Sequence, residues 1–244
     1  MIDSADAPIT RLAVIGDLHA EHERLDRVVD WLAGRTVDHI VCTGDIADGR
    51  GSVNASCAIL HTGNVTTVAG NHDRWLLGDT VRHVSQAHRR SDLNDDSIAF
   101  LERLPRSRTL ETVSGPLLLC HGVGENDLAQ VWPGRRPEEV RRSRDLDTLI
   151  AGDEHRFVIN GHMHFRVLMH FRNLTLLNAG TLMGDRAGVT VLDFEAGTIT
   201  AYSVVDGRRP ERLMEIALAP DDTHRVWHDT GEFDGTWEPV LLYA

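Results

Sequence analysis

The sequence predicts an α/β fold, an α+β sandwich in which two mixed β-sheets pack face to face and helices cover the outside. Before residue 70, apolar β-branched runs alternate with segments of helical periodicity, which is typical of parallel βαβ units. After residue 165, strand-like runs follow one another with short turns, which is typical of a β-meander. A chain of 244 residues, 41% of them hydrophobic, can bury such a core in a single domain, 1–244.

The first part of the chain repeats a strand, a loop and a helix. The predicted elements are a strand at 11–15, a helix at 22–33, a strand at 39–43, a helix at 52–62 and a strand at 65–69. Apolar residues of the first helix recur at helical spacing, and each strand ends at a glycine that precedes an aspartate or asparagine. Because a parallel sheet binds its ligands at the carboxyl ends of its strands, these polar residues mark the candidate site.

The rest of the chain combines a helical excursion with a series of strands. Residues 74–105 are polar and helical in pattern, and we expect them to pack over the strand ends near the site. Strands are predicted at 108–113, 116–120, 156–160, 166–171, 174–178, 188–194, 198–204 and 212–218, with an Arg-rich helical segment at 135–150. Residues 220–244 form a C-terminal tail that this pattern does not place.

Charge and cysteine usage exclude several classes of function. The chain has 25 basic and 37 acidic residues, a net charge of -12, which disfavours nucleic acid and anionic membranes as partners. All basic residues are arginines, so no lysine is available for a phosphate-binding P-loop or a Schiff base. Three unpatterned cysteines, no run of ~18 apolar residues and no N-terminal leader pattern predict a cytoplasmic protein without a membrane span.

Side chains of the kind that bind metals follow five of the predicted strands. They are Asp17 and His19, Asp45, Asn71, His121, and His162 with His164. In an extended segment, ligands two residues apart lie on the same face, so each Asp-x-His or His-x-His pair can reach one site. Carboxylate, amide and imidazole ligands without a thiolate suit manganese, iron, cobalt, nickel or zinc. The set is too large for one tetrahedral ion, whereas two ions sharing a carboxylate accommodate it.

Two divalent ions ~3.5–4 Å apart can polarise a phosphoryl group, generate hydroxide and stabilise the attacking and leaving oxygens. The pattern therefore predicts hydrolysis at phosphorus. The remaining histidines, His88 among them, lie outside these positions and receive no role. A cationic cluster is formed by Arg135, Arg136, Arg141, Arg142 and Arg144. Because acidic residues are interleaved with it, a solvated helix face is favoured over a clamp for substrate phosphates.

The blocks that contain these ligands resemble the five ordered motifs of the calcineurin-like metallophosphoesterases. The blocks are Gly16-Asp17-Leu18-His19, Gly44-Asp45-Ile46-Ala47-Asp48, Gly70-Asn71-His72-Asp73, Cys120-His121-Gly122 and Gly161-His162-Met163-His164. The resemblance covers roughly residues 11–182 and implies the four-layer αββα fold of that family. It is closest to the small bacterial phosphodiesterase-like members, with features of the diadenosine-tetraphosphatase and phosphoprotein-phosphatase branch.

The resemblance also implies roles for individual residues. Asp17, His19 and His164 would bind the first metal, Asn71, His121 and His162 the second, and Asp45 would bridge them. The implied cofactor is a pair of divalent ions, with manganese or iron favoured over zinc, cobalt or nickel. His72 would act as general acid or transition-state stabiliser, and Asp48 would pair with it.

The chain departs from the phosphatase branch in two places, and an arginine lies at each of them. That branch has an arginine directly after its second aspartate, whereas this chain reads Asp48-Gly49-Arg50, and the branch has glutamate where this chain reads Asp73-Arg74. Arg50 and Arg74 are therefore candidate substrate-binding residues, and the chain is not predicted to be an orthodox serine/threonine phosphatase.

The predicted function is hydrolysis of a small-molecule phosphodiester or nucleotide-type substrate. One alternative is a diadenosine-polyphosphate hydrolase or a protein-phosphatase-like enzyme. Another, of a different class, is a non-catalytic scaffold that binds a protein partner on the same fold. The native metal, the substrate and the oligomeric state stay open at this point.

Overall fold

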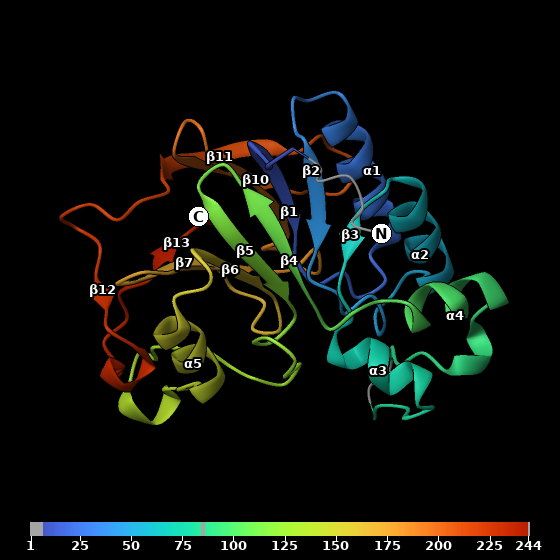
Figure 1. Ribbon diagram of the computed structural model, residues 1–244. Coiled ribbons are helices and arrows are strands. Elements are labelled where there is room, and N and C mark those ends of the chain that lie inside the picture. Colours follow the sequence, from blue (N-terminus) through green and yellow to red (C-terminus); the bar gives the residue numbers. More distant parts are fainter. Residues whose placement is uncertain (1–6, 84–85, 244) are drawn as a thin grey trace, which may run out of the picture.

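The structure is a computed structural model that describes residues 7–83 and 86–243 (Figure 1). The N-terminal residues 1–6, in which no leader was predicted, lie outside the described residues. So do residues 84–85 of the helical excursion and the last residue of the tail.

The first sheet has six strands in the order β11-β10-β9-β1-β2-β3. Three strands are parallel to one another: β1 (Arg11–Ile15), β2 (His39–Cys42) and β3 (Thr66–Thr67). The other three continue the sheet as an antiparallel meander: β9 (Gly188–Asp193), β10 (Thr198–Ser203) and β11 (Glu211–Ala217). The central strand β1 therefore joins the two halves of the chain.

The second sheet has the order β12-β7-β8-β6-β5-β4, with β13 paired to β7. Its strands are β4 (Ser107–Thr112), β5 (Gly115–Cys120), β6 (Phe157–Asn160), β7 (Arg166–Phe171), β8 (Thr175–Ala179), β12 (Val226–Trp227) and β13 (Val240–Leu241). The central strands β5, β6 and β8 are parallel, and β4 and β7 run antiparallel to them. The structure thus confirms the predicted pair of mixed sheets.

The α-helices are α1 (His22–Ala33), α2 (Val53–Thr62), α3 (Asn71–Leu77), α4 (Asp95–Glu102) and α5 (Arg144–Gly152). Helices α1 and α2 lie against the first sheet and α5 against the second, while α4 packs beside α2 and α3 beside α4 (Figure 1). Alternate residues of β1 point to opposite sides: Ala13 and Ile15 pack with α1 and α2, while Leu12 and Val14 pack against the second sheet. A third apolar cluster lies between the second sheet, α5 and the tail.

Three segments differ from the predicted elements. The strand predicted at 65–69 is reduced to Thr66–Thr67 at the edge of its sheet. The Arg-rich segment forms a short 3₁₀ helix at Pro137–Glu139, and its α-helix begins only at Arg144, where Ser143 caps the helix by accepting a hydrogen bond from Leu146 N–H. The tail contributes β12 and β13 to the second sheet, and its Trp227 and Phe233 are buried in the third cluster.

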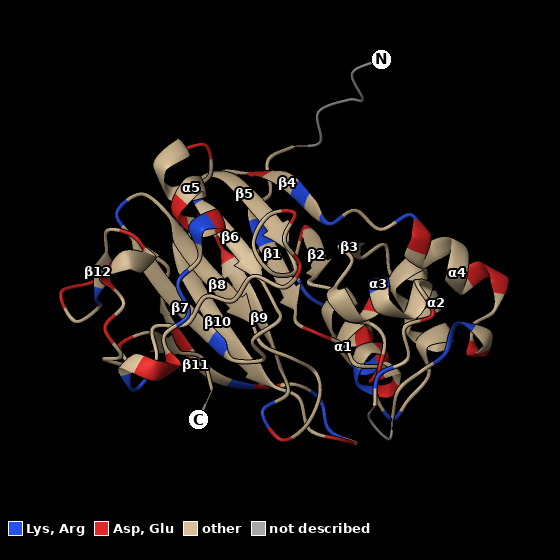
Figure 2. Cartoon of the chain, turned by 90° about the horizontal axis from the view of Figure 1, so that it is seen from below, with Lys and Arg blue, Asp and Glu red and all other residues tan. Residues whose placement is uncertain are grey.

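Basic and acidic residues are interspersed over many elements rather than separated into two faces (Figure 2). Among the described residues, none of the helices combines the length and the apolar character that a bilayer span requires.

Candidate metal centre

The predicted ligands come together from loops of both sheets. Loops of the first sheet supply Asp17, His19, Asp45 and, at the start of α3, Asn71, whereas loops of the second sheet supply His121, His162 and His164. An isolated bridge between Asp17 and Thr181 holds the two sets of loops together. The ligands therefore lie where the carboxyl ends of parallel strands in both sheets meet.

The backbone of this region adopts the left-handed conformation at four of the ligands. The φ angles are 46° at His19, 46° at Asp45, 66° at His162 and 56° at His164. Non-glycine residues rarely adopt positive φ, and such strain persists where the surrounding structure enforces it, commonly at functional sites.

The glycines of the blocks let the backbone approach the carboxylates. A Cβ atom on Gly161 would lie 1.9 Å from Asp17 Oδ1, and one on Gly70 would lie 2.1 Å from Asp45 Oδ1. The absence of a side chain at these two positions is therefore a requirement of the site rather than of the turns alone.

Ligand atoms form two groups that share one carboxylate. The first contains Asp17, His19, Asp45 and His164, and the second contains Asp45, His121 and His162; within each group the atoms lie within 4.8 Å of one another. His19 Nε2 is 2.9 Å from His164 Nε2, and His121 Nε2 is 3.3 Å from Asp45 Oδ2. Either group offers the mixed oxygen and nitrogen donors that first-row divalent ions accept.

The amide oxygen of Asn71 provides a test of whether the second group fits a cation. This oxygen faces hydrogen-bond acceptors, and it lies 3.0 Å from His121 Nε2. His121 Nδ1 is 2.8 Å from the Thr43 carbonyl oxygen, so the proton of a neutral imidazole belongs on Nδ1 and the Nε2 lone pair points at Asn71. Lone pairs that converge in this way fit a metal ion.

The electrostatics of the centre also favour positive charge. Burial lowers the pKa of His121, but the carboxylates of Asp45 and Asp17 outweigh burial and raise it to about 10. All three side chains are buried, so little solvent screens this field. Without a cation these carboxylates therefore favour the protonated ring, and a divalent cation would take the place of the proton on Nε2 and be stabilised by the same carboxylates.

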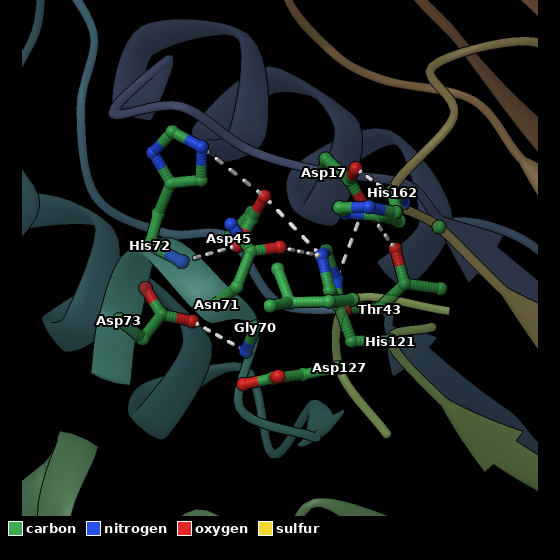
Figure 3. Close-up of polar contacts among 12 residues, drawn as sticks. Asp17, Thr43, Asp45, Gly70, Asn71, His72, Asp73, His121, Asp127 and His162 are labelled. Atoms are coloured by element: carbon green, nitrogen blue, oxygen red, sulfur yellow. Dashed lines mark hydrogen bonds and ion pairs between the residues drawn. The ribbon is translucent and has the colours of Figure 1, made fainter. Parts of the chain in front are cut away.

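Neighbouring groups orient the candidate ligands (Figure 3). Thr43 Oγ1 donates to Asp17 Oδ1 at 2.8 Å, and the His162 backbone N–H donates to Asp17 Oδ2 at 2.7 Å. The His72 backbone N–H donates to Asp45 Oδ1 at 2.9 Å. Each carboxylate thus keeps a fixed rotamer, a kind of support that strongly affects metal affinity in proteins.

His72 lies beside this centre at the start of α3 and is held by a chain of polar contacts. Its Nδ1 is 2.8 Å from Asp48 Oδ2, and the other Asp48 oxygen accepts the His88 backbone N–H at 2.9 Å. Burial raises the pKa of Asp48, but the hydrogen bonds from His72 and His88 outweigh burial and lower it. On the far side of the ring, Arg82 Nη1 lies 3.0 Å from His72 Nε2.

Comparison with known proteins assigns the fold and the family. Residues 11–197 match the model of the calcineurin-like phosphoesterase superfamily domain. The chain belongs to this family. An uncharacterized protein of Methanocaldococcus jannaschii, MJ0912, is 27% identical over 181 residues, which are 71% of this chain and 70% of that protein.

Solved structures share the fold of this phosphoesterase. A metallophosphoesterase from Sphaerobacter thermophilus is similar with a TM-score of 0.60 and 20% identity, over 83% of this chain and 90% of that one. Yfce, a phosphoesterase from E. coli, is similar with a TM-score of 0.52 and 15% identity, over 86% and 100% of the two chains.

The two predicted substrate-binding arginines of this phosphoesterase, Arg74 and Arg50, have different surroundings. Arg74 donates to Asp127 through Nε at 2.6 Å and Nη2 at 3.0 Å, so its guanidinium is already paired. Arg50 is exposed on the loop after Asp48, and substrate binding by either residue stays a prediction. Arg82 and His88 were missed because both belong to the helical excursion, outside every recognisable motif.

The aspartate after His72 ties two loops of the phosphoesterase together. The Asp73 carboxylate is fully buried and accepts the backbone N–H groups of Gly70 at 2.9 Å, Ile46 at 2.7 Å and Ala47 at 3.0 Å. Burial and the nearby Asp45 raise its pKa to about 7.

Asp73→Ala is expected to lower the free energy of unfolding by about 3 kcal/mol, because it leaves three buried donors without an acceptor. Urea denaturation of the purified protein measures this loss. Asp222→Ala, at an exposed position, is the control and should stay near the wild-type value. An Asp73→Ala protein as stable as this control would contradict the structural role.

Proposed function

We propose that the chain is a dinuclear, metal-dependent phosphoesterase that hydrolyses a phosphodiester or nucleotide-type small molecule. The observation that carries this proposal is the pair of ligand groups that share Asp45. A single group of ligands would hold one ion. Two groups that share the Asp45 carboxylate can hold two adjacent ions, with this carboxylate between them.

The two ligand groups suggest how the residues would divide between the ions. Asp17, His19 and His164 would hold one ion, Asn71, His121 and His162 the other, and Asp45 both. When bound, such a pair polarises phosphoryl oxygens and lowers the pKa of water. Manganese and iron are the favoured ions for this oxygen and nitrogen set. Cys42, Cys57 and Cys120 are free and buried, which supports a reducing, cytoplasmic compartment.

His72 would serve the leaving oxygen. Asp48 accepts from Nδ1, which fixes the ring and directs Nε2 away from the Asp48 loop. The contact between the backbone N–H of His72 and Asp45 places this ring at a fixed position beside the shared carboxylate. A histidine held in this way can donate a hydrogen bond or a proton to the group that departs.

The test is manganese-supported hydrolysis of bis-p-nitrophenyl phosphate and of p-nitrophenyl phosphate, with the Asp45→Asn variant as the blank. Faster diester turnover supports the proposal, and a monoester preference moves the assignment to the phosphatase branch. Hydrolysis of diadenosine tetraphosphate alone favours the polyphosphatase alternative. Absence of turnover together with fewer than two ions per chain, measured by elemental analysis, favours the protein-binding scaffold.

Arg82→Ala is expected to raise the KM for p-nitrophenyl phosphate by about tenfold with a smaller change in kcat, because a hydrogen bond from a charged donor to the phosphate is lost. We expect Arg82 to reach the phosphate because its guanidinium lies against His72 Nε2, on the side of the ring where the leaving group would lie. Steady-state kinetics measure the effect, with exposed Arg209→Ala as the matched control. An unchanged KM in Arg82→Ala would refute this role.

A further inference from the structure

A hollow of about 480 Å³ includes a residue of the His162–His164 loop in its lining. Three loops line it: the loop between β5 and α5 with Trp132 and Arg135, the loop between β6 and β7 with Met163 and Phe165, and the loop after β8 with Arg186. Met163 stands between the candidate ligands His162 and His164 in the chain. The lining of the hollow therefore includes a residue that is the chain neighbour of two candidate ligands, and the volume of the hollow is in the range of small-molecule sites.

Aromatic rings form one wall of this hollow. The ring centroids of Trp132 and Phe165 are 4.4 Å apart with 38° between the planes, and Trp132 also packs on Trp237 of the tail at 4.3 Å. Reciprocal backbone hydrogen bonds with Arg141, of 3.0 and 2.8 Å, hold Trp132 in place. Trp132 and Phe165 are only half-buried, so the stack keeps aromatic surface open to the hollow.

Three arginines contribute to the rest of the lining, together with Gln130 and Glu139. Arg135 lies over the Trp237 ring at 5.7 Å, Arg186 lies over the Tyr243 ring at 4.9 Å, and Arg141 donates to the carbonyl oxygens of Glu138 and Val140. The carboxylate of Glu139 pairs with Arg136 and accepts the Arg135 backbone N–H at 3.1 Å. The lining of the hollow therefore contains three arginines and one glutamate, in a chain with a net charge of -12.

The neighbouring Arg136 shows the contrast. Its guanidinium pairs with Glu138 at 3.5 Å and with Glu139 at 2.5 Å, and its side chain is 67% exposed. The favoured interpretation of the arginine cluster as a solvated face describes Arg136. Arg135 and Arg141 are exposed as well, and they differ from Arg136 in that they line the hollow.

We propose that this hollow is a nucleotide subsite: Trp132 and Phe165 stack on the base, and Arg135, Arg141 and Arg186 bind a phosphate that is not cleaved. The inference rests on the proposed function, because the subsite would hold the part of the substrate that extends beyond the scissile phosphorus. It narrows the substrate class to molecules with a nucleoside and at least two phosphates or a nucleotide diester. Any nucleobase can stack on an aromatic side chain, because every base has a flat face. A guanidinium group can donate two parallel hydrogen bonds to the oxygens of one phosphate.

The test is calorimetric binding of adenosine, adenosine monophosphate and ribose 5-phosphate to the purified full chain. Adenosine has no phosphate to contact the metal centre, so its binding reports the aromatic wall. Adenosine monophosphate should bind more tightly than either of the other two. Phe165→Leu should weaken adenosine and adenosine monophosphate alike by about tenfold. The double variant Arg135→Ala, Arg186→Ala should weaken only the nucleotide, by about tenfold or more.

Arg108→Ala is the matched control, because Arg108 is an exposed arginine on β4 of the same sheet. Thermal unfolding checks that the Phe165→Leu variant folds. If that variant does not fold, the arginine double variant still tests the subsite. The inference is overturned if adenosine monophosphate binds no better than ribose 5-phosphate, or if both sets of variants bind it like the control.

Failure of the subsite and failure of the proposed function are distinguishable. Bis-p-nitrophenyl phosphate carries no nucleoside, so its hydrolysis should survive in the subsite variants. Hydrolysis of the diester without nucleotide binding would refute the subsite and support the proposed function. Nucleotide binding that the variants weaken, in a protein that hydrolyses no phosphoester, would refute the proposed function and support the subsite.

Discussion

Asp45→Asn is expected to lower kcat/KM for bis-p-nitrophenyl phosphate by more than about a hundredfold, since even the loss of groups that merely support a metal ligand costs 10- to 100-fold. Asp45 is the only residue common to both ligand groups among the described residues. Neutralising it removes the charge that holds two cations side by side. Elemental analysis should therefore show fewer than two ions per chain, alongside the kinetic loss.

The fold should survive this substitution. Asparagine retains an oxygen that can accept the His72 backbone N–H, which Asp45 Oδ1 accepts at 2.9 Å. Asp26→Asn, on the exposed face of α1, is the matched control and should keep full activity and metal content. Wild-type turnover in Asp45→Asn would sink the dinuclear assignment.

His72→Ala is expected to lower kcat by about a hundred- to ten-thousand-fold for substrates with alkoxide leaving groups, which is the usual contribution of a general acid. The loss should be smaller for p-nitrophenyl esters, because nitrophenolate departs without a proton. Metal content should stay at the wild-type level, since His72 belongs to neither ligand group. A series of diesters with leaving groups of increasing basicity measures this dependence.

The matched control is His228→Ala, which removes an imidazole with a 51% exposed side chain far along the chain in the tail. Asp48→Asn should show a weaker version of the His72→Ala profile, because it loosens the ring without removing it. An equal loss for all leaving groups would argue that His72 supports the structure rather than the departing oxygen.

Patterns within short segments predicted much of this molecule. Alternation of apolar residues is a local property, so strands such as β1 and β5 and the two-sheet sandwich were accessible from the sequence, and the structure confirms them. The candidate ligands were accessible for the same reason, since each lies directly after such a strand. Their roles remain predictions that the variants above test.

Contacts between distant segments were not accessible. Arg74 reaches Asp127 across 53 residues, and the His88 segment reaches Asp48 across 40, so no local pattern announces either contact. Strands β12 and β13 consist of two residues each, too few to show a period, and only pairing with β7 makes them strands.

The division of the candidate ligands between the two sheets has a thermodynamic consequence. Each ligand group contains residues from loops of both sheets: His164 joins Asp17 and His19, and His121 and His162 join Asp45. An ion in either group would act as a further cross-link between sheets that are joined by apolar contacts and by hydrogen bonds between their loops. Because such a site does not exist in the unfolded chain, the binding free energy of the ions would add directly to the free energy of unfolding. Chelation would then weaken the sandwich as a whole as well as stopping turnover.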